Sequence, residues 1–271
     1  MSMISTVSAD WLALRCEADD AARSSALLSQ LSAPAGPLAG MVHDLGSGTG
    51  AMLRWLAPRL AGPQRWVLHD GDEAILAARG SQPILDAEGA PVEVATSIEA
   101  LAELDTNALR GASLVTASAL LDVITRDEAA AIVAACTAAA APAFFSLTVT
   151  GEVALRPSDP LDRALRDAFN DHQRRVADGR RLLGPEAVSI VRGLFVTAGW
   201  RTRTASTPWL LGPDSRRLVG EWLDGWVGAA VEQTPELAAH AAAYLVRRRA
   251  ELATGSLRVR VQHEDLIAWP A

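Results

Sequence analysis

The sequence contains no lysine. All 25 basic residues are arginines, and with 32 acidic residues they give a formal net charge of −7. Proteins that bind nucleic acids normally present a basic face. This balance argues against an RNA or DNA partner. An RNA substrate would require the arginines to gather on one face despite the acidic total.

Cysteines and long apolar runs are also scarce. Cys16 and Cys136 lie far apart and lack metal-ligand spacing, so we interpret them as small buried hydrophobic residues in a reducing compartment. No run reaches the ~18 apolar residues of a membrane span, and the N-terminus lacks a signal-peptide layout. We therefore expect a cytoplasmic protein without a membrane partner. With 49% hydrophobic residues, the 271-residue chain suffices for one large α/β domain, and its alanine runs at 129–141 and 238–243 predict helices.

A glycine-rich stretch dominates the first half of the chain. A short apolar run reaches Asp44, and Gly46, Gly48 and Gly50 follow at alternate positions. Residues 51–56 then have helical apolar spacing. This order predicts a strand, a tight turn and a helix. Glycine permits positive φ angles and close approach of a ligand to the backbone, and the helix directs its free N–H groups at that ligand.

Two ligand classes use such a turn. Gly46, Gly48 and Ala51 satisfy the loose dinucleotide pattern, in which a pyrophosphate lies on the helix N-terminus. Asp44, however, would repel a pyrophosphate and suits a ligand with an ammonium group. The motif hydrophobic-hydrophobic-Asp-Leu-Gly-x-Gly-x-Gly resembles that of the class I S-adenosylmethionine (SAM)-dependent methyltransferases of small-molecule type. An NAD-dependent oxidoreductase and a turn without any ligand remain alternatives.

The resemblance implies an α/β fold, a Rossmann-like doubly wound seven-stranded sheet with an antiparallel last strand, and SAM as the cofactor. Five apolar segments alternating with helical ones support a parallel sheet, with strands expected at 41–45, 66–69, 92–95, 113–117 and 143–149. Asp70 ends the second strand about 20 residues after the glycine turn, where a carboxylate accepts hydrogen bonds from ribose hydroxyls. We assign Asp72 to capping the helix at 73–79, and Thr125 with Glu128 to capping a helix that begins at Arg126.

The family often binds the adenine amino group with an acidic side chain after the third strand. This sequence offers Thr96 or Ser97 there, so we expect Ser97 or the backbone of Ile98 to serve. The full predicted cofactor-binding set is Asp44, Gly46, Ser47, Gly48, Gly50, Asp70, Gly71, Ser97, Ile98 and Ser118.

We divide the chain into an N-terminal helical cap (1–37) and a SAM-binding domain (38–271). One or two helices are expected within 9–31, ended by the Pro34–Pro37 stretch, and Arg15 and Arg23 either reach a ligand carboxylate from above or face solvent. Residues 151–184 predict a substrate lid, because they follow a strand end where open α/β sheets bind ligands. A helical insertion is expected at 214–253, between strands at 200–204 and 257–261.

Methyl transfer to a hydroxyl needs a group that removes its proton. We assign this role to His172, whose ordinary pKa lies near neutrality, and expect Asp122 to orient the acceptor. Arg174 and Arg175 suit an anionic substrate, and Trp209 an apolar wall. No metal-ligand spacing is recognisable. We expect O-methylation of a small, possibly anionic metabolite; a non-catalytic scaffold, an RNA methyltransferase and homo-oligomerisation stay open.

Overall fold

The fold is built on one central sheet. A computed structural model describes residues 8–35, 38, 40–101, 104–177 and 179–271. The sheet contains β1 (Gly40–Leu45), β2 (Gln64–Asp70), β3 (Glu93–Ile98), β4 (Leu114–Ser118), β5 (Ala143–Arg156), β8 (Arg201–Ser206), β9 (Trp209–Leu211) and β10 (Arg258–Trp269). Its order is β3-β2-β1-β4-β5-β10-β8, and β9 pairs with β10. β1 to β5 are parallel, whereas β10 is antiparallel to β5, β8 and β9. The predicted doubly wound sheet is confirmed, with β9 as an eighth strand.

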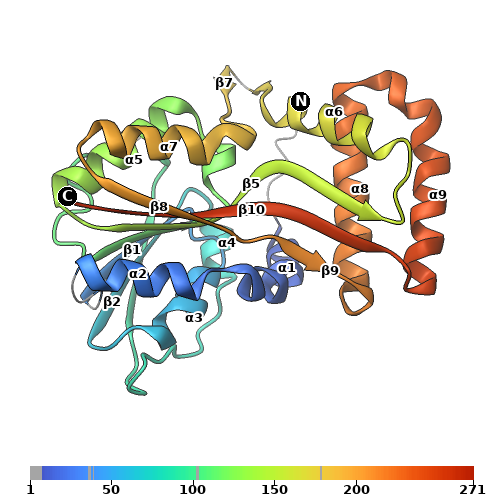
Figure 1. Cartoon of the computed structure of the whole chain (residues 1–271). Helices are drawn as coiled ribbons and strands as arrows, with labels where there is room; N and C mark the ends of the chain where they lie inside the picture. The colour runs from blue at the N-terminus through green and yellow to red at the C-terminus, as the bar shows by residue number, and fades with distance from the viewer. Residues whose placement is uncertain (1–7, 36–37, 39, 102–103, 178) are drawn as a thin grey trace.

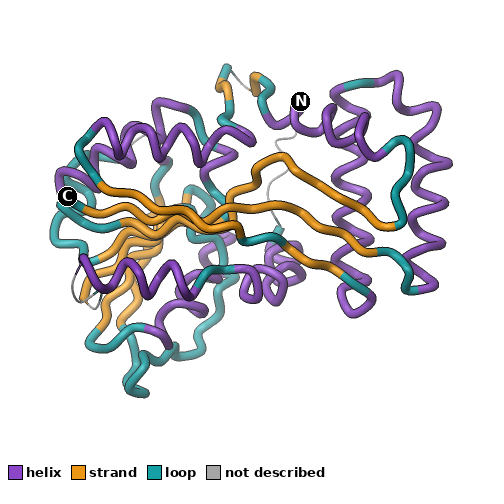
Figure 2. Tube along the Cα trace, viewed as in Figure 1, coloured by secondary structure: helices purple, strands orange, loops and turns teal. Residues whose placement is uncertain are grey.

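Helices cover both faces of this sheet. They are α1 (Ala9–Ala22), α2 (Ser25–Ala35), α3 (Ala51–Leu56), α4 (Glu73–Ala77), α5 (Arg126–Ala139), α6 (Asp162–Gln173), α7 (Ala187–Thr197), α8 (Arg216–Gln233) and α9 (Ala238–Thr254). In Figure 1, α5 and α7 lie above the sheet, and α2 and α3 lie below it. Figure 2 shows the strands as the middle layer between these helices. A small hairpin joins β6 (Val176–Ala177) to β7 (Arg180–Arg181).

The apolar cores follow from strand alternation. Successive side chains of a strand point to opposite faces. On β1, Leu45 therefore packs in the core that contains α5 and α7 residues, while Val42 packs in the core that contains α2 and α3 residues. Both side chains are fully buried, as is Trp66 of β2. The carboxyl ends of β1 to β4 lie at one edge of the sheet, which carries the glycine turn.

β5 and β10 extend well beyond the other strands. β5 continues to Arg156, so the first residues of the predicted lid are strand, and β10 continues past the predicted end at 261 to Trp269. The long antiparallel pair carries β9 and supports α6, α8 and α9 at the right of Figure 1. A third core joins these helices to the ribbon and includes Trp222, Trp226 and Tyr244. The segments predicted separately as a lid and an insertion thus form one packed unit, which we call the α6–α8–α9 unit.

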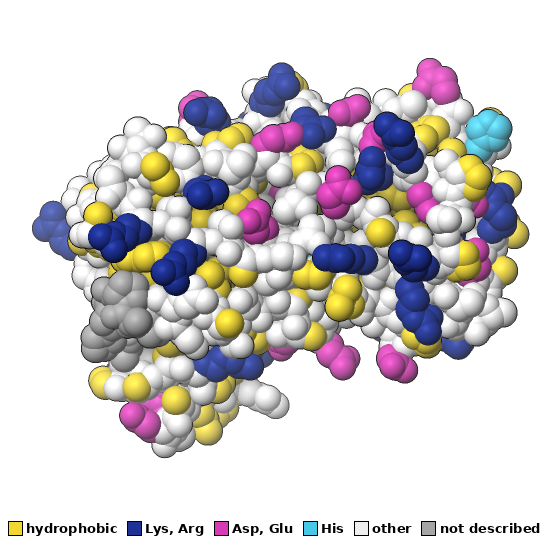
Figure 3. Space-filling model, viewed as in Figure 1, with side chains coloured by type: hydrophobic (Ala, Val, Ile, Leu, Met, Phe, Trp, Pro, Cys, Tyr) yellow, Lys and Arg dark blue, Asp and Glu magenta, His cyan; other side chains and the backbone are white. Residues whose placement is uncertain are grey.

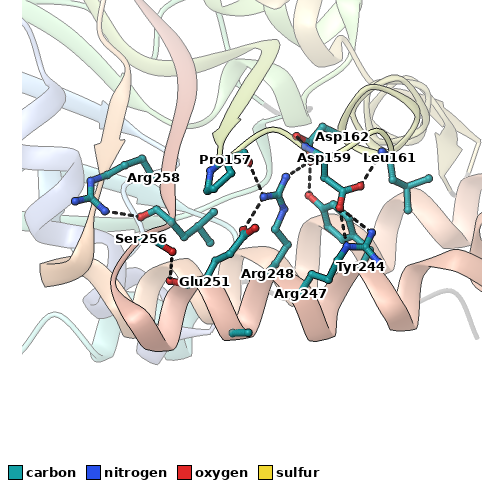
Figure 4. Close-up of polar contacts among 12 residues, drawn as sticks. Pro157, Asp159, Leu161, Asp162, Tyr244, Arg247, Arg248, Glu251, Ser256 and Arg258 are labelled. Carbon is teal, nitrogen blue, oxygen red and sulfur yellow. Dashed lines mark hydrogen bonds and ion pairs between the residues drawn. The ribbon is translucent and has the colours of Figure 1, made fainter.

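A buried arginine anchors this α6–α8–α9 unit (Figure 4). Arg248 of α9 donates to the Pro157 carbonyl at 2.7 Å, to Asp162 at 2.6 Å and to Glu251 at 2.7 Å. The Tyr244 hydroxyl also donates to Asp162, at 2.8 Å. Because a buried charge is tolerated only when it is paired, this network fixes α9 to the loop between β5 and α6.

Several local predictions are confirmed. α1 and α2 are the two helices expected near the N-terminus, although Pro34 lies within α2, and Gly36 and Pro37 fall outside the described residues. Asp72 caps α4 through the Ala74 and Ile75 N–H groups. Thr125 and Glu128 form a reciprocal cap at the start of α5. Both alanine runs are helical, and none of the described helices is long and apolar enough to cross a membrane.

Candidate active site

The glycine turn adopts the conformation that its sequence predicts. Gly46, Gly48 and Gly50 have φ angles of +59°, +54° and +76°, which disfavour residues with a Cβ. A Cβ on Gly46 would also lie 2.6 Å from Leu120 Cδ1. A substitution at Gly46 therefore meets both backbone strain and a steric clash.

Asp44 is the buried acid at the start of this turn. Its side chain is only 1% exposed, and Oδ1 accepts a hydrogen bond from the Thr116 hydroxyl at 2.7 Å. Oδ2 is buried without a hydrogen-bond partner among the described residues. Burial raises the pKa of Asp44 to about 7, despite the opposing effects of Thr116 and Arg23. A buried carboxylate oxygen without a donor suits a ligand that brings an ammonium group.

Arg23 approaches the same place from the end of α1. Its buried guanidinium donates to Ser118 Oγ at 3.1 Å and pairs with Asp20. Nε has no partner among the described residues, and neither does the hydroxyl of Ser47 in the turn. Arg23 also acts electrostatically on Asp44, lowering its pKa. Ser118 and Arg23 together can therefore bind a carboxylate beside an ammonium held by Asp44.

Asp70 connects the second strand to the glycine turn. Its carboxylate accepts the Gly48 N–H at 2.8 Å and the Asp72 N–H at 3.0 Å. The acidic residue predicted to bind a ribose thus lies against the turn, and Gly71 follows it on the exposed side. A ligand bound against the backbone of the turn would therefore lie beside this carboxylate.

The end of β3 corrects one expectation. The strand continues to Ile98, beyond the predicted end at residue 95, so Glu99 is the acidic residue directly after it. Glu99 accepts from the Ser97 hydroxyl at 3.0 Å and from His69 Nδ1 at 2.7 Å. Ile98 is 55% exposed. Sequence reasoning missed Glu99 because it ended the strand too early, although the residue lies only two positions after Ser97.

A second part of the site is an aromatic cavity of about 250 Å³. α1, the loop after β4, β5, α6, β9, α8 and β10 enclose it. Its aromatic lining consists of Trp11, Phe169, Trp209, Trp222 and Trp226. Its polar and charged lining consists of Arg15, Asp122, Glu152, Asn170, Gln173, Gln262 and His263. Trp209, predicted as part of an apolar wall, is among these residues.

Backbone strain is concentrated at this cavity. Ala119 and Leu147 both line it and have positive φ angles of 52° and 58°. Such a conformation costs of order 1–3 kcal/mol for a residue with a Cβ, so the surrounding structure must enforce it. Asp265 is fully buried and accepts the Leu147 N–H at 2.9 Å, the Ser24 N–H at 2.9 Å and the Thr207 hydroxyl at 2.8 Å. Asp265 therefore positions the cavity wall at Leu147.

Two titratable groups line the cavity close to the sheet. Asp122 lies in a single helical turn after β4, and burial raises its pKa to about 6. His263 of β10 is buried, and its pKa is lowered to about 3, first by burial and then by Arg15. Its Nδ1 has no partner among the described residues. Sequence reasoning missed His263, although it continues the buried alternation of Val259 and Val261.

The structure places His172 elsewhere. Its Nε2 lies 3.3 Å from Glu232 of α8, and its Nδ1 lies 3.1 Å from Arg175. Arg174 forms ion pairs with Glu186 and Asp171. The face of α6 that lines the cavity instead carries Phe169, Asn170 and Gln173. Among the described residues, the cavity lining does not include His172, Arg174 or Arg175, because their side chains bind neighbours outside it.

The surface and the acidic residues add two observations. Basic and acidic side chains are interspersed on the face drawn in Figure 3, so its coloured residues form no continuous basic patch. Within the described ranges, no three His, Cys, Asp or Glu side chains come together as a metal site.

Comparison with known proteins gives a likeness of overall fold only. No protein-family model and no curated protein match the chain. A cyclopropane synthase from Mycobacterium tuberculosis has 14% identity and a TM-score of 0.49, covering 96% of this chain and 94% of that one. The YcgJ protein from Bacillus subtilis has 10% identity and a TM-score of 0.48, covering 92% and 100%. A SAM-dependent methyltransferase from Geobacter sulfurreducens, in complex with S-adenosylhomocysteine, has 15% identity and a TM-score of 0.40, covering 95% and 98%. These scores carry no argument about chemistry, so we base the function on this chain's own residues.

Proposed function

We propose that the protein is a SAM-dependent methyltransferase that modifies a small molecule. The observation that carries this proposal is the unpartnered, buried carboxylate oxygen of Asp44 beside three glycines at positive φ. The chemistry of these residues fits the charged groups of the cofactor. Asp44 would bind its ammonium group, and Arg23 with Ser118 its carboxylate. Asp70 would bind the ribose.

The adenine would lie at the end of β3. Glu99 and Ser97 share a hydrogen bond there, and Ile98 offers an exposed apolar surface. The backbone of the turn from Gly46 to Gly50 would contact the methionine part of the cofactor. Leu12 of α1 would lie only 3.1 Å from a Cβ on Gly48, so α1 covers this turn.

Bound SAM supplies a methyl group on a sulfonium, and transfer to an oxygen or nitrogen leaves a neutral sulfide and releases one proton. In our proposal Asp122 accepts this proton, because it lines the cavity and a pKa near 6 leaves it ionised at neutral pH. His263 stays neutral and orients the acceptor. The proposal moves the role predicted for His172 to Asp122, and the orienting role predicted for Asp122 to His263.

The α6–α8–α9 unit and α1 would close the site. Trp11 and Arg15 of α1 face the cavity from one side, and α6 and α8 from the other. We propose that they exclude water from the reacting atoms and hold the acceptor in line with the methyl group. We keep the division into an N-terminal helical cap (1–37) and a SAM-binding domain (38–271) as part of this proposal.

Isothermal titration calorimetry with S-adenosylhomocysteine and with NAD tests the proposal. We expect S-adenosylhomocysteine to bind and NAD not to bind. Asp44→Asn should weaken S-adenosylhomocysteine binding at least tenfold, since an amide is a poor partner for an ammonium group. The control is Asp72→Asn at the same sheet edge, where asparagine still caps α4. NAD binding without a response to S-adenosylhomocysteine would contradict the proposal and favour an oxidoreductase.

A methyl-transfer screen separates an enzyme from a scaffold. We expect S-adenosylhomocysteine to form from SAM in the presence of small hydroxylated or amine acceptors. Tight cofactor binding without transfer to any acceptor would favour the non-catalytic scaffold.

A further inference from the structure

The aromatic cavity indicates what kind of acceptor the protein takes. We propose that it binds a compact, ring-bearing amine as the ammonium ion, in preference to an anion. The assignment of this amine as the methyl acceptor rests on the proposed function, whereas its binding in the cavity does not. Four observations support this ligand class: the volume of the cavity, its aromatic walls, its unpartnered hydrogen-bond acceptors and its charge.

The volume and the walls select a ring. A cavity of about 150 Å³ holds benzene, so the 250 Å³ observed here leaves room for one ring and a short side chain. Trp222 and Trp226 stack with ring centroids 5.1 Å apart and an interplanar angle of 15°. Trp11, Trp209 and Phe169 complete the walls. Aromatic faces of this kind attract both flat rings and cations.

The polar atoms of α6 select a hydrogen-bond donor. Asn170 Nδ2 donates to the Gly151 carbonyl at 3.0 Å, and this carbonyl can only accept, so Asn170 Oδ1 is oriented as an acceptor. Oδ1 of Asn170 and Oε1 of Gln173 are buried without partners among the described residues. Residues three apart lie on one helix face. Two unpartnered acceptors on one helix face favour a ligand that brings N–H groups, because buried acceptors left unmatched cost free energy.

The charges that face the cavity favour a cation. Arg15 is its basic residue, and Asp19 binds that guanidinium through two hydrogen bonds of 2.8 and 3.1 Å, while the group lies 4.9 Å from the centre of the Trp209 ring. His263 is neutral at neutral pH, because burial lowers its pKa to about 3. Glu152 is 70% exposed and lies 3.4 Å from Arg166. Arg15 also lowers the pKa of Asp122 electrostatically, but Asp122 forms no ion pair with another described residue, so a cationic ligand can pair with it.

An amine also fits the proposed chemistry of Asp122. The bound ammonium transfers one proton to the Asp122 carboxylate and becomes a neutral amine. Its lone pair then forms the N–CH3 bond as the CH3–S bond breaks, with that electron pair remaining on sulfur. The products are a methylammonium ion, S-adenosylhomocysteine and the proton on Asp122. The arginines that suggested an anionic substrate, Arg174 and Arg175, bind other residues.

Three matched probes test the ligand class: 2-phenylethylamine, 2-phenylethanol and 3-phenylpropionate. They share one ring and a short chain, and they differ in charge. Binding to the full-length protein is measured by quenching of tryptophan fluorescence, to which the four tryptophans of the cavity wall contribute among the eight of the chain. We expect the amine to bind at least tenfold more tightly than the carboxylate, with the alcohol between them.

Two variants locate the site. Gln173→Lys places a positive charge beside Asn170 and should weaken binding of the amine at least tenfold, while improving binding of the carboxylate. Gln233→Lys makes the same change at the exposed end of α8, outside the cavity lining, and should leave both affinities within about twofold. Carboxylate or alcohol binding at least as tight as amine binding would overturn the proposal. So would an absence of binding by all three probes, or equal effects of the two variants.

Calorimetry with S-adenosylhomocysteine, performed in parallel, keeps the two proposals distinguishable. Amine binding without S-adenosylhomocysteine binding would contradict the proposed function and leave the ligand class intact. S-adenosylhomocysteine binding with carboxylate preference would contradict the ligand class alone.

Discussion

The cofactor side and the acceptor side of the candidate site are built differently. The cofactor side consists mainly of one continuous stretch from Asp44 to Gly50, with Asp70 added from the next strand. The acceptor side combines residues from α1, β5, α6, α8, β9 and β10. A single turn with special φ requirements restricts its own sequence, whereas an aromatic cavity assembled from distant elements does not. The cofactor side can therefore be predicted from local sequence, whereas the acceptor side depends on tertiary packing and cannot.

Asp122→Asn should have the largest effect on this account, because it removes the proton acceptor and conserves side-chain size. General-base catalysis contributes about 10²–10⁴-fold, so we expect a loss of turnover in that range, with S-adenosylhomocysteine affinity within about twofold. Turnover is measured on the acceptor that a methyl-transfer screen identifies. Asp127→Asn, on the exposed first turn of α5, serves as the control.

The native pH profile sharpens the assignment of Asp122. Because its pKa is raised to about 6, the carboxylate becomes protonated as the pH falls below 6, and turnover should fall about tenfold per pH unit there. SAM is kept saturating at every pH, so that protonation of Asp44 does not limit turnover. Under that condition, full turnover in Asp122→Asn, or the same acid limb in that variant, would show that another group takes the proton.

Arg248→Ala should destabilise the α6–α8–α9 unit, which forms part of the acceptor side. It removes the fully buried guanidinium and leaves the partly buried Asp162 without its cation, and breaking a buried pair costs up to about 3–5 kcal/mol. We expect this decrease in the free energy of unfolding, measured by urea denaturation, and weaker binding of 2-phenylethylamine. Arg249→Ala on the same helix removes an exposed pair with Asp224 and should change stability by no more than about 1 kcal/mol. Equal effects of the two variants would contradict the anchoring role of Arg248.

Gly46→Ala should damage the cofactor side by a smaller amount. Its positive φ and the contact with Leu120 predict a destabilisation of about 1–3 kcal/mol and at least tenfold weaker S-adenosylhomocysteine binding. Gly80→Ala is a matched control, because Gly80 has φ +78° but nothing within 4 Å of an added Cβ. Thermal unfolding and calorimetry check both variants. A similar loss in the two variants would mean that backbone strain alone, and not the packing of the turn, is responsible.

Much of the fold could be predicted from local signals. The glycine turn, the cap at Thr125 and the alternation of strands and helices each depend on neighbouring residues, and the structure has them where they were expected. The lengths of β5 and β10 could not be predicted. β10 contains His263, Glu264 and Asp265 in its middle, and only pairing with β5 and β8 makes such a polar segment a strand.

The acceptor side shows the same limit. His172 and Arg174 stood out because they are polar residues in a predicted lid, but rotation about the helix axis of α6 directs them to Glu232 and Glu186. Asn170 and Gln173, on the face toward the cavity, gave no signal of their own. To predict which face of a helix lines a cavity, one must know which elements surround that cavity.

The pH dependence of S-adenosylhomocysteine affinity tests the central claim, that Asp44 holds the ammonium group of the cofactor. Burial raises the pKa of Asp44 to about 7, so its carboxylate is neutralised as the pH falls below 7. Calorimetry from pH 8 to pH 5 should show that the affinity of the native protein falls toward tenfold per pH unit below pH 7. The affinity of Asp44→Asn should be low and nearly constant over this range. Equal affinities of the native protein and Asp44→Asn at every pH would contradict the account.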